Sequence, residues 1–254
     1  MIYIRSLIFN IICYSTILLG SMLTCVVGLF SQKAEINTWN NVLLPFLRGC
    51  LYVICGMKIE VRGREHITKH GVLYACKHQS AMETYFLTSY VKNGTFIFKK
   101  ELSRIPFFGW AIHLYGSVPV DRSGGSTAMK KMLADTKALM EKDRSIIIFP
   151  EGTRTKPGST VFYKPGIAFL YQNIQTEVVP VALNTGMFWR KNSFLRHPGK
   201  VIIEFMPPLP HGMEKREFIN TLQDTIEKKC AELNLETVNR YPETRIMLEK
   251  PQGK

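Results

Sequence analysis

The cysteines of the sequence do not form the pattern of a metal site or of a disulfide framework. None of its six cysteines forms a Cys-x-x-Cys motif: four lie in apolar segments near the N-terminus, and Cys76 and Cys230 stand alone. We therefore expect neither a structural metal nor a disulfide framework. Isolated cysteines in a basic chain favour a reducing environment, so we expect the folded part of the chain to face the cytoplasm.

Internal repeats, low-complexity tracts and nucleic-acid-binding motifs are also absent. At 254 residues the chain can bury one sizeable core, which favours one domain plus an appendage. The formal net charge of +13 has to be explained by partners. With no zinc pattern, RNA-recognition signature or separate basic arm, nucleic acid is not an expected partner. Membrane lipids and phosphate-bearing substrates fit better, and lysines scattered over a solvated face are the alternative for most of the charge.

Charged residues are missing from a long stretch near the N-terminus, residues 6–32. Within it, residues 7–30 form an apolar run of about 24 residues, which is long enough to cross or enter a bilayer. A cleaved signal peptide would have a shorter apolar region and a small-residue cleavage site, and neither is present. We therefore expect a retained membrane anchor.

A second apolar stretch, residues 42–57, contains Arg48 and an early proline, which make a full crossing of the bilayer costly. A helix embedded in one leaflet fits better, and an ordinary buried helix of the following domain is the alternative. We assign residues 1–57 to N-terminal membrane-anchoring helices and residues 58–254 to the second domain. Residues 247–254 are expected to form a solvated tail.

From residue 58 onward, short runs rich in Val, Ile, Phe and Tyr alternate with longer segments of helical period. Strands are predicted at residues 58–62, 72–76, 95–98, 117–120, 145–149, 178–183 and 201–205. Helices are predicted at residues 81–91, 106–114, 126–141, 166–172 and 215–234. This alternation predicts an α/β domain with a central mixed, partly parallel sheet.

Polar side chains follow four of the predicted strands at the point where each strand ends. They are His78, Lys99, Lys100, Asp121, Arg122 and the run from Glu151 to Arg154. Ligands of α/β sheets bind at the carboxyl ends of the strands. We therefore expect one histidine, several acids and several cations to share one edge of the sheet.

His78 and Glu83 stand five positions apart in the stretch KHQSAMET. Inside a regular helix, residues five apart point about 140° away from each other, since each residue turns about 100°. If the helix begins at Ser80, however, His78 precedes it and Glu83 leans back towards its N-terminus, so the two side chains can meet. The alternative is that Ser80 and Glu83 only form a capping box.

A histidine paired with a carboxylate suits proton transfer, because the carboxylate fixes the imidazole tautomer and leaves the other nitrogen free. No Gly-x-Ser-x-Gly elbow is present, and Cys76 is expected inside a strand, so an enzyme nucleophile is not evident. The simplest use of such a base is to activate an acceptor hydroxyl for direct attack on a carbonyl. One histidine and one acid make a poor zinc site, so neither a metal nor another cofactor is expected.

The stretch FPEGTR, residues 149–154, follows the apolar run SIIIF. A proline and a glycine suit a plain tight turn. A turn does not require Arg154, however, and an arginine fork matches phosphate oxygens while glycine lets the backbone approach a ligand.

Several motifs in a fixed order give the chain a resemblance to the glycerolipid acyltransferases. KHQSAMET resembles their His-x4-acid motif, GSVPVDR their second motif, FPEGTR their third and VPVAL their fourth, and FKKELSRIPFFG is similar to a stretch between the first two. The resemblance covers roughly residues 58–209. The ordered set resembles the 1-acyl-sn-glycerol-3-phosphate acyltransferase (lysophosphatidate acyltransferase) family, which implies an acyltransferase-like α/β fold in the second domain.

The resemblance implies that His78 is the general base on the 2-hydroxyl of lysophosphatidate and that Glu83 orients it. The alkoxide then attacks the thioester of acyl-CoA or acyl-carrier protein, giving phosphatidate at a membrane, which we expect to be the bacterial inner membrane. The residues expected to hold or shape the phosphate site are Lys99, Lys100, Arg122, Glu151, Gly152, Thr153 and Arg154. The VPVAL strand is expected to support the wall on the acyl side.

Two positions depart from the usual motif: Lys77 replaces an asparagine and Glu83 an aspartate. The motif leaves Lys77 unexplained, and one more phosphate contact is one reading of it. Pro119, in the second motif, predicts an edge strand or a bend. Other readings stay open: another lysophospholipid or a lyso-aminolipid as acceptor, water as acceptor, or a catalytically inactive basic protein that binds membrane surfaces. Retention of both His78 and Glu83 argues against the last.

Overall fold

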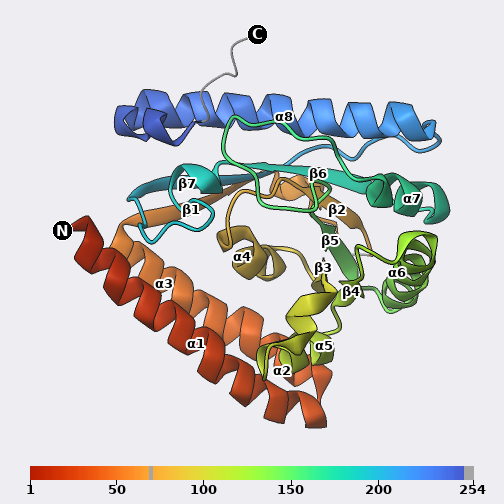
Figure 1. Ribbon diagram of the computed structural model, residues 1–254, viewed down its shortest axis with the longest axis horizontal. Helices are drawn as coiled ribbons and strands as arrows, with labels where there is room; N and C mark the ends of the chain where they lie inside the picture. The colour runs from red at the N-terminus through yellow and green to blue at the C-terminus, as the bar shows by residue number, and fades with distance from the viewer. Residues whose placement is uncertain (69–70, 249–254) are drawn as a thin grey trace.

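The computed structural model describes residues 1–68 and 71–248. Its centre is a seven-stranded sheet with the order β1-β7-β6-β2-β5-β3-β4 (Figure 1). The strands are β1 Met57–Arg62, β2 Leu73–Cys76, β3 Gly94–Lys99, β4 Val118–Val120, β5 Ser145–Ile148, β6 Val178–Leu183 and β7 Gly199–Phe205. Among these described strands, β6 and β7 pair antiparallel and every other pair is parallel. The predicted mixed, partly parallel sheet is confirmed, with each strand within two residues of its expected bounds.

Helices cover both faces of the sheet. They are α4 Met82–Tyr90, α5 Phe108–Leu114, α6 Gly125–Met140, α7 Pro165–Asn173 and α8 Lys215–Arg240. Along β2, Leu73 and Ala75 pack with residues of α6, α7 and α8, whereas Tyr74 and Cys76 pack with residues of α4 on the opposite face. A strand buried on both faces reads as a continuous apolar run, which is why β2 and β5 were predictable from the sequence.

The edge position of β4 explains Pro119. β4 pairs with β3 and is the last strand of the sheet, so the missing N–H of the proline leaves no partner unsatisfied on its open side. The predicted edge is confirmed. Short 3₁₀ segments lie at Arg64–His66, Lys100–Arg104, Thr185–Met187 and Pro242–Met247.

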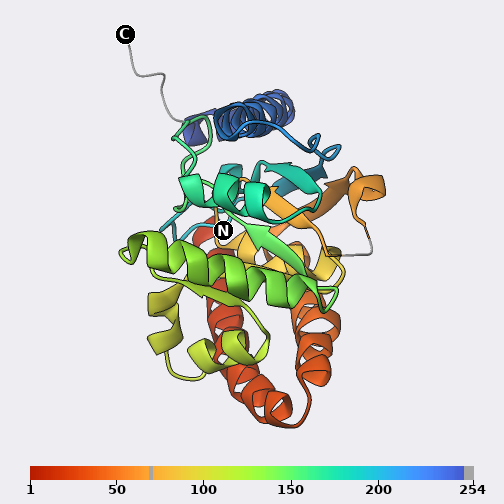
Figure 2. The same ribbon diagram turned by 90° about the vertical axis from the view of Figure 1, so that its right-hand side faces the viewer.

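The N-terminal helices form an antiparallel hairpin on the side of the sheet opposite α8 (Figures 1 and 2). α1 Ile2–Phe30 leads through α2 Gln32–Thr38 and a π-helical stretch, Trp39–Leu43, into α3 Leu44–Cys55. α1 is the described helix that is long and apolar enough to cross a membrane, by length and composition only. The predicted division of the chain at residue 57 stays a prediction.

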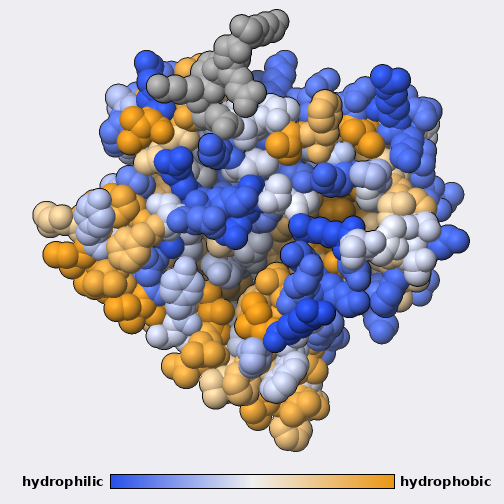
Figure 3. All heavy atoms as spheres, in the orientation of Figure 1, coloured by the Kyte–Doolittle hydropathy of each residue, from blue (hydrophilic) through white to orange (hydrophobic). Residues whose placement is uncertain are grey.

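The hairpin turns its apolar side chains outward. α1 buries mostly small or polar residues, namely Ser6, Asn10, Gly20, Ser21 and Thr24, along with Phe9 and Cys13. α3 packs Leu47 and Leu51 inward but leaves Tyr52 and Val53 exposed. Apolar residues accordingly gather over this part of the surface in Figure 3. α3 is therefore buried against the protein on one side and apolar and exposed on the other, and its embedding in one leaflet stays a prediction.

The expectation of a solvated C-terminal tail is wrong at its first residue. Met247 is 4% exposed and joins the core cluster formed with the N-terminal helices. Residues 249–254 of that tail lie outside the described residues.

Candidate active site

The carboxyl ends of β2, β3, β4 and β5 lie at the same edge of the sheet, where they border a cavity of about 1120 Å³. Its lining includes His78, Lys99, Arg122, Glu151, Gly152, Thr153 and Arg154. Lys100 is not among the described lining residues; its ammonium lies 3.4 Å from the Asp121 carboxylate in an exposed pair. The fold thus brings all but one of the phosphate-site candidates to one cavity.

His78 and Glu83 meet across the start of α4. The His78 Nδ1 lies 2.9 Å from Glu83 Oε1. Because α4 begins at Met82, His78 sits in the turn before it and Glu83 in its first turn, the geometry that the spacing predicts. A carboxylate oxygen only accepts, so Nδ1 carries the hydrogen and Nε2 is left as the free basic nitrogen.

Glu83 also completes one arm of the capping box. Its Oε1 accepts the N–H groups of Gln79 at 2.7 Å and Ser80 at 2.6 Å, and its Oε2 accepts the hydroxyl of Thr185 at 2.8 Å. The Ser80 hydroxyl accepts from the Met82 N–H at 3.1 Å, so the second arm falls one residue short of Glu83. The carboxylate therefore caps the helix and holds the histidine at the same time.

The His78 ring and backbone are fixed from the side of β5. The imidazole stacks on the Phe149 ring, with centroids 4.0 Å apart. The His78 N–H donates to Glu151 Oε2 at 2.6 Å, and the His78 carbonyl accepts from the Thr155 N–H at 2.8 Å. Glu151 of FPEGTR and the following Thr155 therefore hold the main chain of His78 in place.

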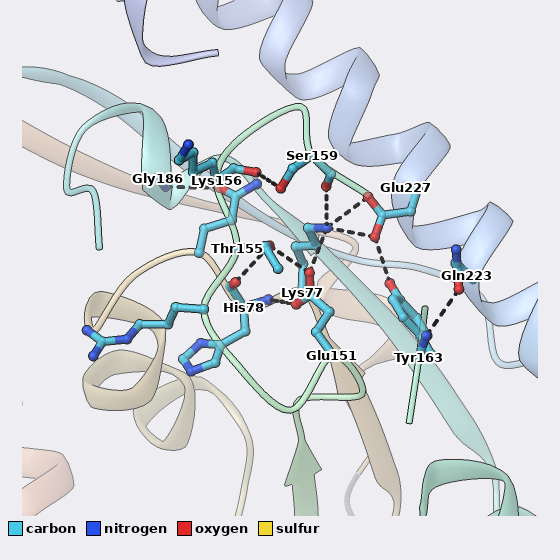
Figure 4. Close-up of polar contacts among 12 residues, drawn as sticks. Lys77, His78, Glu151, Thr155, Lys156, Ser159, Tyr163, Gly186, Gln223 and Glu227 are labelled. Carbon is cyan, nitrogen blue, oxygen red and sulfur yellow. Dashed lines mark hydrogen bonds and ion pairs between the residues drawn. The ribbon is translucent and has the colours of Figure 1, made fainter. Parts of the chain in front are cut away.

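Lys77 is not among the described lining residues of the cavity, so the reading of it as one more phosphate contact is wrong. Its side chain is 1% exposed and its ammonium lies 2.7 Å from Glu151 Oε1 and 2.7 Å from Glu227 Oε1. Figure 4 shows this ammonium between the two carboxylates, with Glu227 projecting from α8. A lysine beside His78 therefore neutralises buried acids instead of binding a ligand.

Burial and charge act against each other in this cluster. Burial raises the pKa of the Glu151 carboxyl, and the Lys77 ammonium opposes that rise. Burial alone would lower the pKa of Lys77, but Glu151 and Glu227 outweigh it, so the pKa of the ammonium is raised. Lys77 is therefore charged throughout the physiological range.

Two cations that the sequence motifs do not mark also line the cavity, Lys164 and Lys191. The Lys191 ammonium donates to the Arg154 carbonyl at 3.0 Å, so a loop that follows β6 lies against FPEGTR. Gly152 has φ +69°, and a Cβ there would meet Lys164 Cγ at 3.2 Å. Lys191 had no signal in the sequence, because only the fold brings its loop to this edge.

Apolar residues also line the cavity. Phe98 of β3, Leu102, and Phe108 and Ile112 of α5 line it, together with Trp39 and Leu44 of the N-terminal hairpin. The cavity therefore joins the polar sheet edge to the hairpin. β6, expected to support the acyl-side wall, is buried along its whole length and supplies none of the described lining residues. Thr185, just beyond β6, is the residue of this region that reaches Glu83.

Comparisons with known proteins agree on one family. The family model described as Acyltransferase matches residues 58–184, half of the chain. A 1-acyl-sn-glycerol-3-phosphate acyltransferase from Pseudomonas aeruginosa is 34% identical over 157 residues, covering 62% of this chain and 61% of that protein. The match thus spans about three fifths of that relative's length. A protein of the same name from Escherichia coli is 28% identical over 250 residues, covering 94% of this chain and 98% of that protein.

A solved structure also resembles the chain. The 1-acyl-sn-glycerophosphate (LPA) acyltransferase PlsC from Thermotoga maritima superposes with a TM-score of 0.74 at 22% sequence identity, covering 91% of this chain and 96% of that chain. At this identity the likeness shows the fold, and it confirms the predicted acyltransferase-like α/β architecture with N-terminal helices.

Proposed function

Because the chain belongs to the acyltransferase family, we propose that it acylates the 2-hydroxyl of 1-acyl-sn-glycerol-3-phosphate and releases phosphatidate. The observation that carries this proposal is the His78–Glu83 pair, 2.9 Å apart, at a cavity lined by both cations and apolar residues. A lysolipid phosphate has both chemistries in one molecule. The names of the relatives from P. aeruginosa and E. coli support the same acceptor.

The chemistry is a direct transfer. His78 Nε2 takes the proton of the acceptor hydroxyl as its oxygen bonds to the thioester carbonyl carbon. The tetrahedral adduct collapses, the carbon–sulfur bond breaks, and the imidazolium returns the proton to the leaving thiolate. Glu83 holds the ring and stabilises its protonated form, in the way a buried carboxylate serves a catalytic histidine. His78 and the two substrates account for every proton and bond in this proposed transfer, so it requires neither a metal nor another cofactor.

Substrate placement follows from the cavity lining. Arg122, Arg154 and Lys99 hold the acceptor phosphate, and Gly152 and Thr153 let the backbone approach it. Glu151 shapes the site through the His78 backbone instead of meeting the phosphate. Lys100 stands outside the lining, so its part is a longer-range attraction of anions. The acyl chain of the acceptor lies along apolar lining residues, which include Trp39 and Leu44 of the hairpin.

The hairpin holds the enzyme at a membrane. Its exposed apolar side chains face lipid, which places the acceptor beside the cavity, and the α/β domain faces the cytoplasm at a bacterial inner membrane. The donor is acyl-CoA or acyl-carrier protein, since both are anionic and the chain carries a net charge of +13.

The proposal is tested by thiol release from acyl-CoA in detergent, with and without 1-acyl-sn-glycerol-3-phosphate, and by chromatography of the lipid product. We expect release that requires the lysolipid and yields phosphatidate. Lysolipid-independent release would instead indicate a thioesterase. Activity restricted to acyl-carrier protein would fix the donor, and activity on other lysophospholipids or lyso-aminolipids alone would replace the acceptor.

His78→Ala gives the matching test of mechanism. We expect kcat to fall by about 10²–10⁴-fold, the usual contribution of a general base, with an unchanged circular dichroism spectrum and unchanged membrane association. Near-normal turnover by the folded variant would rule out His78 as the base.

A further inference from the structure

The Lys77 side chain joins three segments that are far apart in the sequence. Its ammonium lies 2.7 Å from Glu151 Oε1 after β5, 2.7 and 2.8 Å from the two Glu227 oxygens on α8, and 3.4 Å from the Ser159 carbonyl. With the side chain 1% exposed, water has little access to these contacts. Figure 4 shows all of them converging on one nitrogen.

The same carboxylate connects Lys77 to the backbone of its own neighbour. Glu151 Oε2 accepts the His78 N–H at 2.6 Å, while Oε1 accepts from Lys77 and from the Thr155 hydroxyl at 2.7 Å. Thr155 in turn donates its N–H to the His78 carbonyl. A change at the ammonium is therefore transmitted to the His78 main chain through one shared carboxylate.

Helix α8 supports this arrangement from the other side. Glu227 also accepts the Tyr163 hydroxyl at 3.1 Å, and Gln223 Oε1 accepts the Tyr163 N–H at 3.3 Å. These bonds dock the loop that follows FPEGTR onto α8. Arg154 immediately precedes this loop and Lys164 lies at its other end, and both residues line the cavity.

We propose that Lys77 is a positioning residue: fixed by Glu227 of α8, its ammonium holds the Glu151 carboxylate that anchors the His78 backbone. The kinetic part of this role rests on the proposed function. A carboxylate accepts hydrogen bonds more strongly than a neutral carboxyl, so the anchor depends on charge as well as on shape. Without its counter-charge, a buried carboxylate takes up a proton at much higher pH.

Among the described titratable groups that face Glu151, Lys77 supplies the counter-charge. From the segment before α4 they are Cys76, Lys77 and His78, from the docked loop Tyr163, and from α8 Glu227 and Cys230. Burial raises the pKa of Cys76 and of Tyr163, and that of Cys230 to about 12, so these three stay neutral near pH 7. Glu227 adds a second negative charge, which makes the ammonium more necessary.

Lys77→Met removes the charge and keeps an unbranched side chain. We expect hydrogen exchange at the His78 amide to accelerate by on the order of tenfold, because its acceptor is no longer held as a carboxylate. Exchange is measured by mass spectrometry on the full chain in detergent, in peptides that contain His78. This readout does not depend on which acceptor the enzyme uses, so absence of phosphatidate formation would count against the proposed function alone.

The kinetic expectation for Lys77→Met is a fall in kcat of about 10²-fold near neutral pH, the cost of a misplaced catalytic group. KM for the lysolipid should change by less than about threefold, since no phosphate contact is lost. Because the pKa of Glu151 rises further without Lys77, the loss should be largest at low pH and shrink as pH rises. A merely structural role would lower kcat equally at every pH.

Lys229→Met is the matched control, two residues along α8 from Glu227. It removes a lysine paired with Glu204 and Glu232 away from the cavity, and it should leave both readouts unchanged. Lys77→Gln also removes the ammonium, should act in the same direction as Lys77→Met, and carries the test if Lys77→Met does not fold. Glu227→Gln removes a negative charge beside Glu151 and should not accelerate exchange at the His78 amide. Amide exchange and a pH profile in the folded Lys77 variants equal to those of Lys229→Met would overturn the proposal.

Discussion

At the scale of single residues, Glu83 unites two roles that the sequence offered as alternatives. Its Oε1 receives the N–H groups of Gln79 and Ser80 and also the His78 ring. One oxygen serves all three because the turn before α4 folds these groups around the first turn of the helix. A buried carboxylate with several donors has little freedom to move, so it holds the imidazole in one orientation.

Glu83→Gln is expected to lower kcat by about 10²–10⁴-fold, because a neutral amide does not stabilise the imidazolium and can favour the wrong tautomer. Glu83→Asp keeps the charge and should retain more activity than Glu83→Gln, although its carboxylate is one methylene shorter. The measurement is kcat from thiol release, with thermal unfolding as the control for folding. Equal activities of the wild-type and Glu83→Gln chains would remove the orienting role.

Arg154 is expected to act on the acceptor and not on the donor. Arg154→Ala should raise KM for lysophosphatidate by about 10–10²-fold, because a hydrogen bond between charged groups contributes about 1.5–3 kcal/mol. KM for the thioester should change little. Arg216→Ala, at the exposed start of α8, is the control. A rise in the thioester KM alone would assign FPEGTR to the donor instead.

At the scale of elements, the strands were predictable and the end of α8 was not. Short runs rich in Val, Ile, Phe and Tyr located all seven strands, and the runs are continuous and apolar where the strand is buried throughout, as in β2, β5 and β6. α8, predicted to end at residue 234, continues to Arg240. Its last turns bury Val238 in the cluster that includes Phe9 and Leu47 of the N-terminal hairpin. The Thr237 hydroxyl in these turns accepts from Asn184 at 2.7 Å, a partner 53 residues away in the chain, so a local pattern contains no sign of it.

The candidate site divides in the same way. His78 and Glu83 were predictable as a pair because their contact depends only on where one helix begins. The burial of Lys77 was not, since Glu227 lies 150 residues further along and only the packing of α8 brings it near. Lys191 reached the cavity through a loop with no motif. Sequence patterns thus identified the His78–Glu83 pair, whereas the contacts of Lys77 and Lys191 depend on long-range packing.

α2 contains a buried acid with no partner. The Glu35 side chain is fully buried, and neither carboxylate oxygen has a hydrogen-bond partner among the described residues. Burial raises its pKa from 4.5 to about 8, with Arg144 opposing the rise. The folded state therefore keeps a proton that the unfolded chain releases, so its contribution to stability is full below about pH 4.5 and is lost as pH rises through about 8.

Glu35→Gln should remove this dependence, because the amide is neutral at every pH. We expect the unfolding temperature of the variant, relative to the wild-type chain, to increase steadily between pH 5 and about pH 8. Thermal unfolding in detergent across this range is the measurement. Glu65→Gln, at a side chain 74% exposed, is the control and should give a constant difference. A pH-independent difference for Glu35→Gln would mean that the carboxyl is solvated.

At the scale of the whole molecule, α1 has the opposite pattern to a helix of a water-soluble protein. Small and polar residues face the protein, while Ile4, Leu7, Ile11 and Leu18 are between 48% and 64% exposed. Such a surface is stable only when something other than water covers it. The hairpin and α8 lie on opposite sides of the sheet, so this apolar surface belongs to one side of the molecule (Figures 1 and 2).

Replacing Leu7, Ile11 and Leu18 together by Gln should weaken membrane association by at least about tenfold, because each buried apolar side chain contributes about 1.5–3 kcal/mol. Flotation with phosphatidylcholine vesicles after detergent removal measures it. Leu235→Gln with Ile246→Gln is the control, since these residues are 61% and 76% exposed but lie outside the hairpin. Equal loss in both variants would mean that apolar exposure in general, and not the hairpin, drives association.

α1 is hydrogen-bonded to the α/β domain near both of its ends. The Arg196 N–H donates to the Ser6 hydroxyl at 2.9 Å, and the Cys25 thiol contacts the Phe107 carbonyl at 3.2 Å. These two contacts tie α1 to the α/β domain, so under the proposed function His78 keeps a constant height above the lipid. On that proposal the two substrates reach His78 by different routes. The lysolipid diffuses laterally in the bilayer, and the thioester diffuses through the surrounding water. We therefore expect turnover to depend on the surface density of lysolipid in the bilayer and not on its bulk concentration.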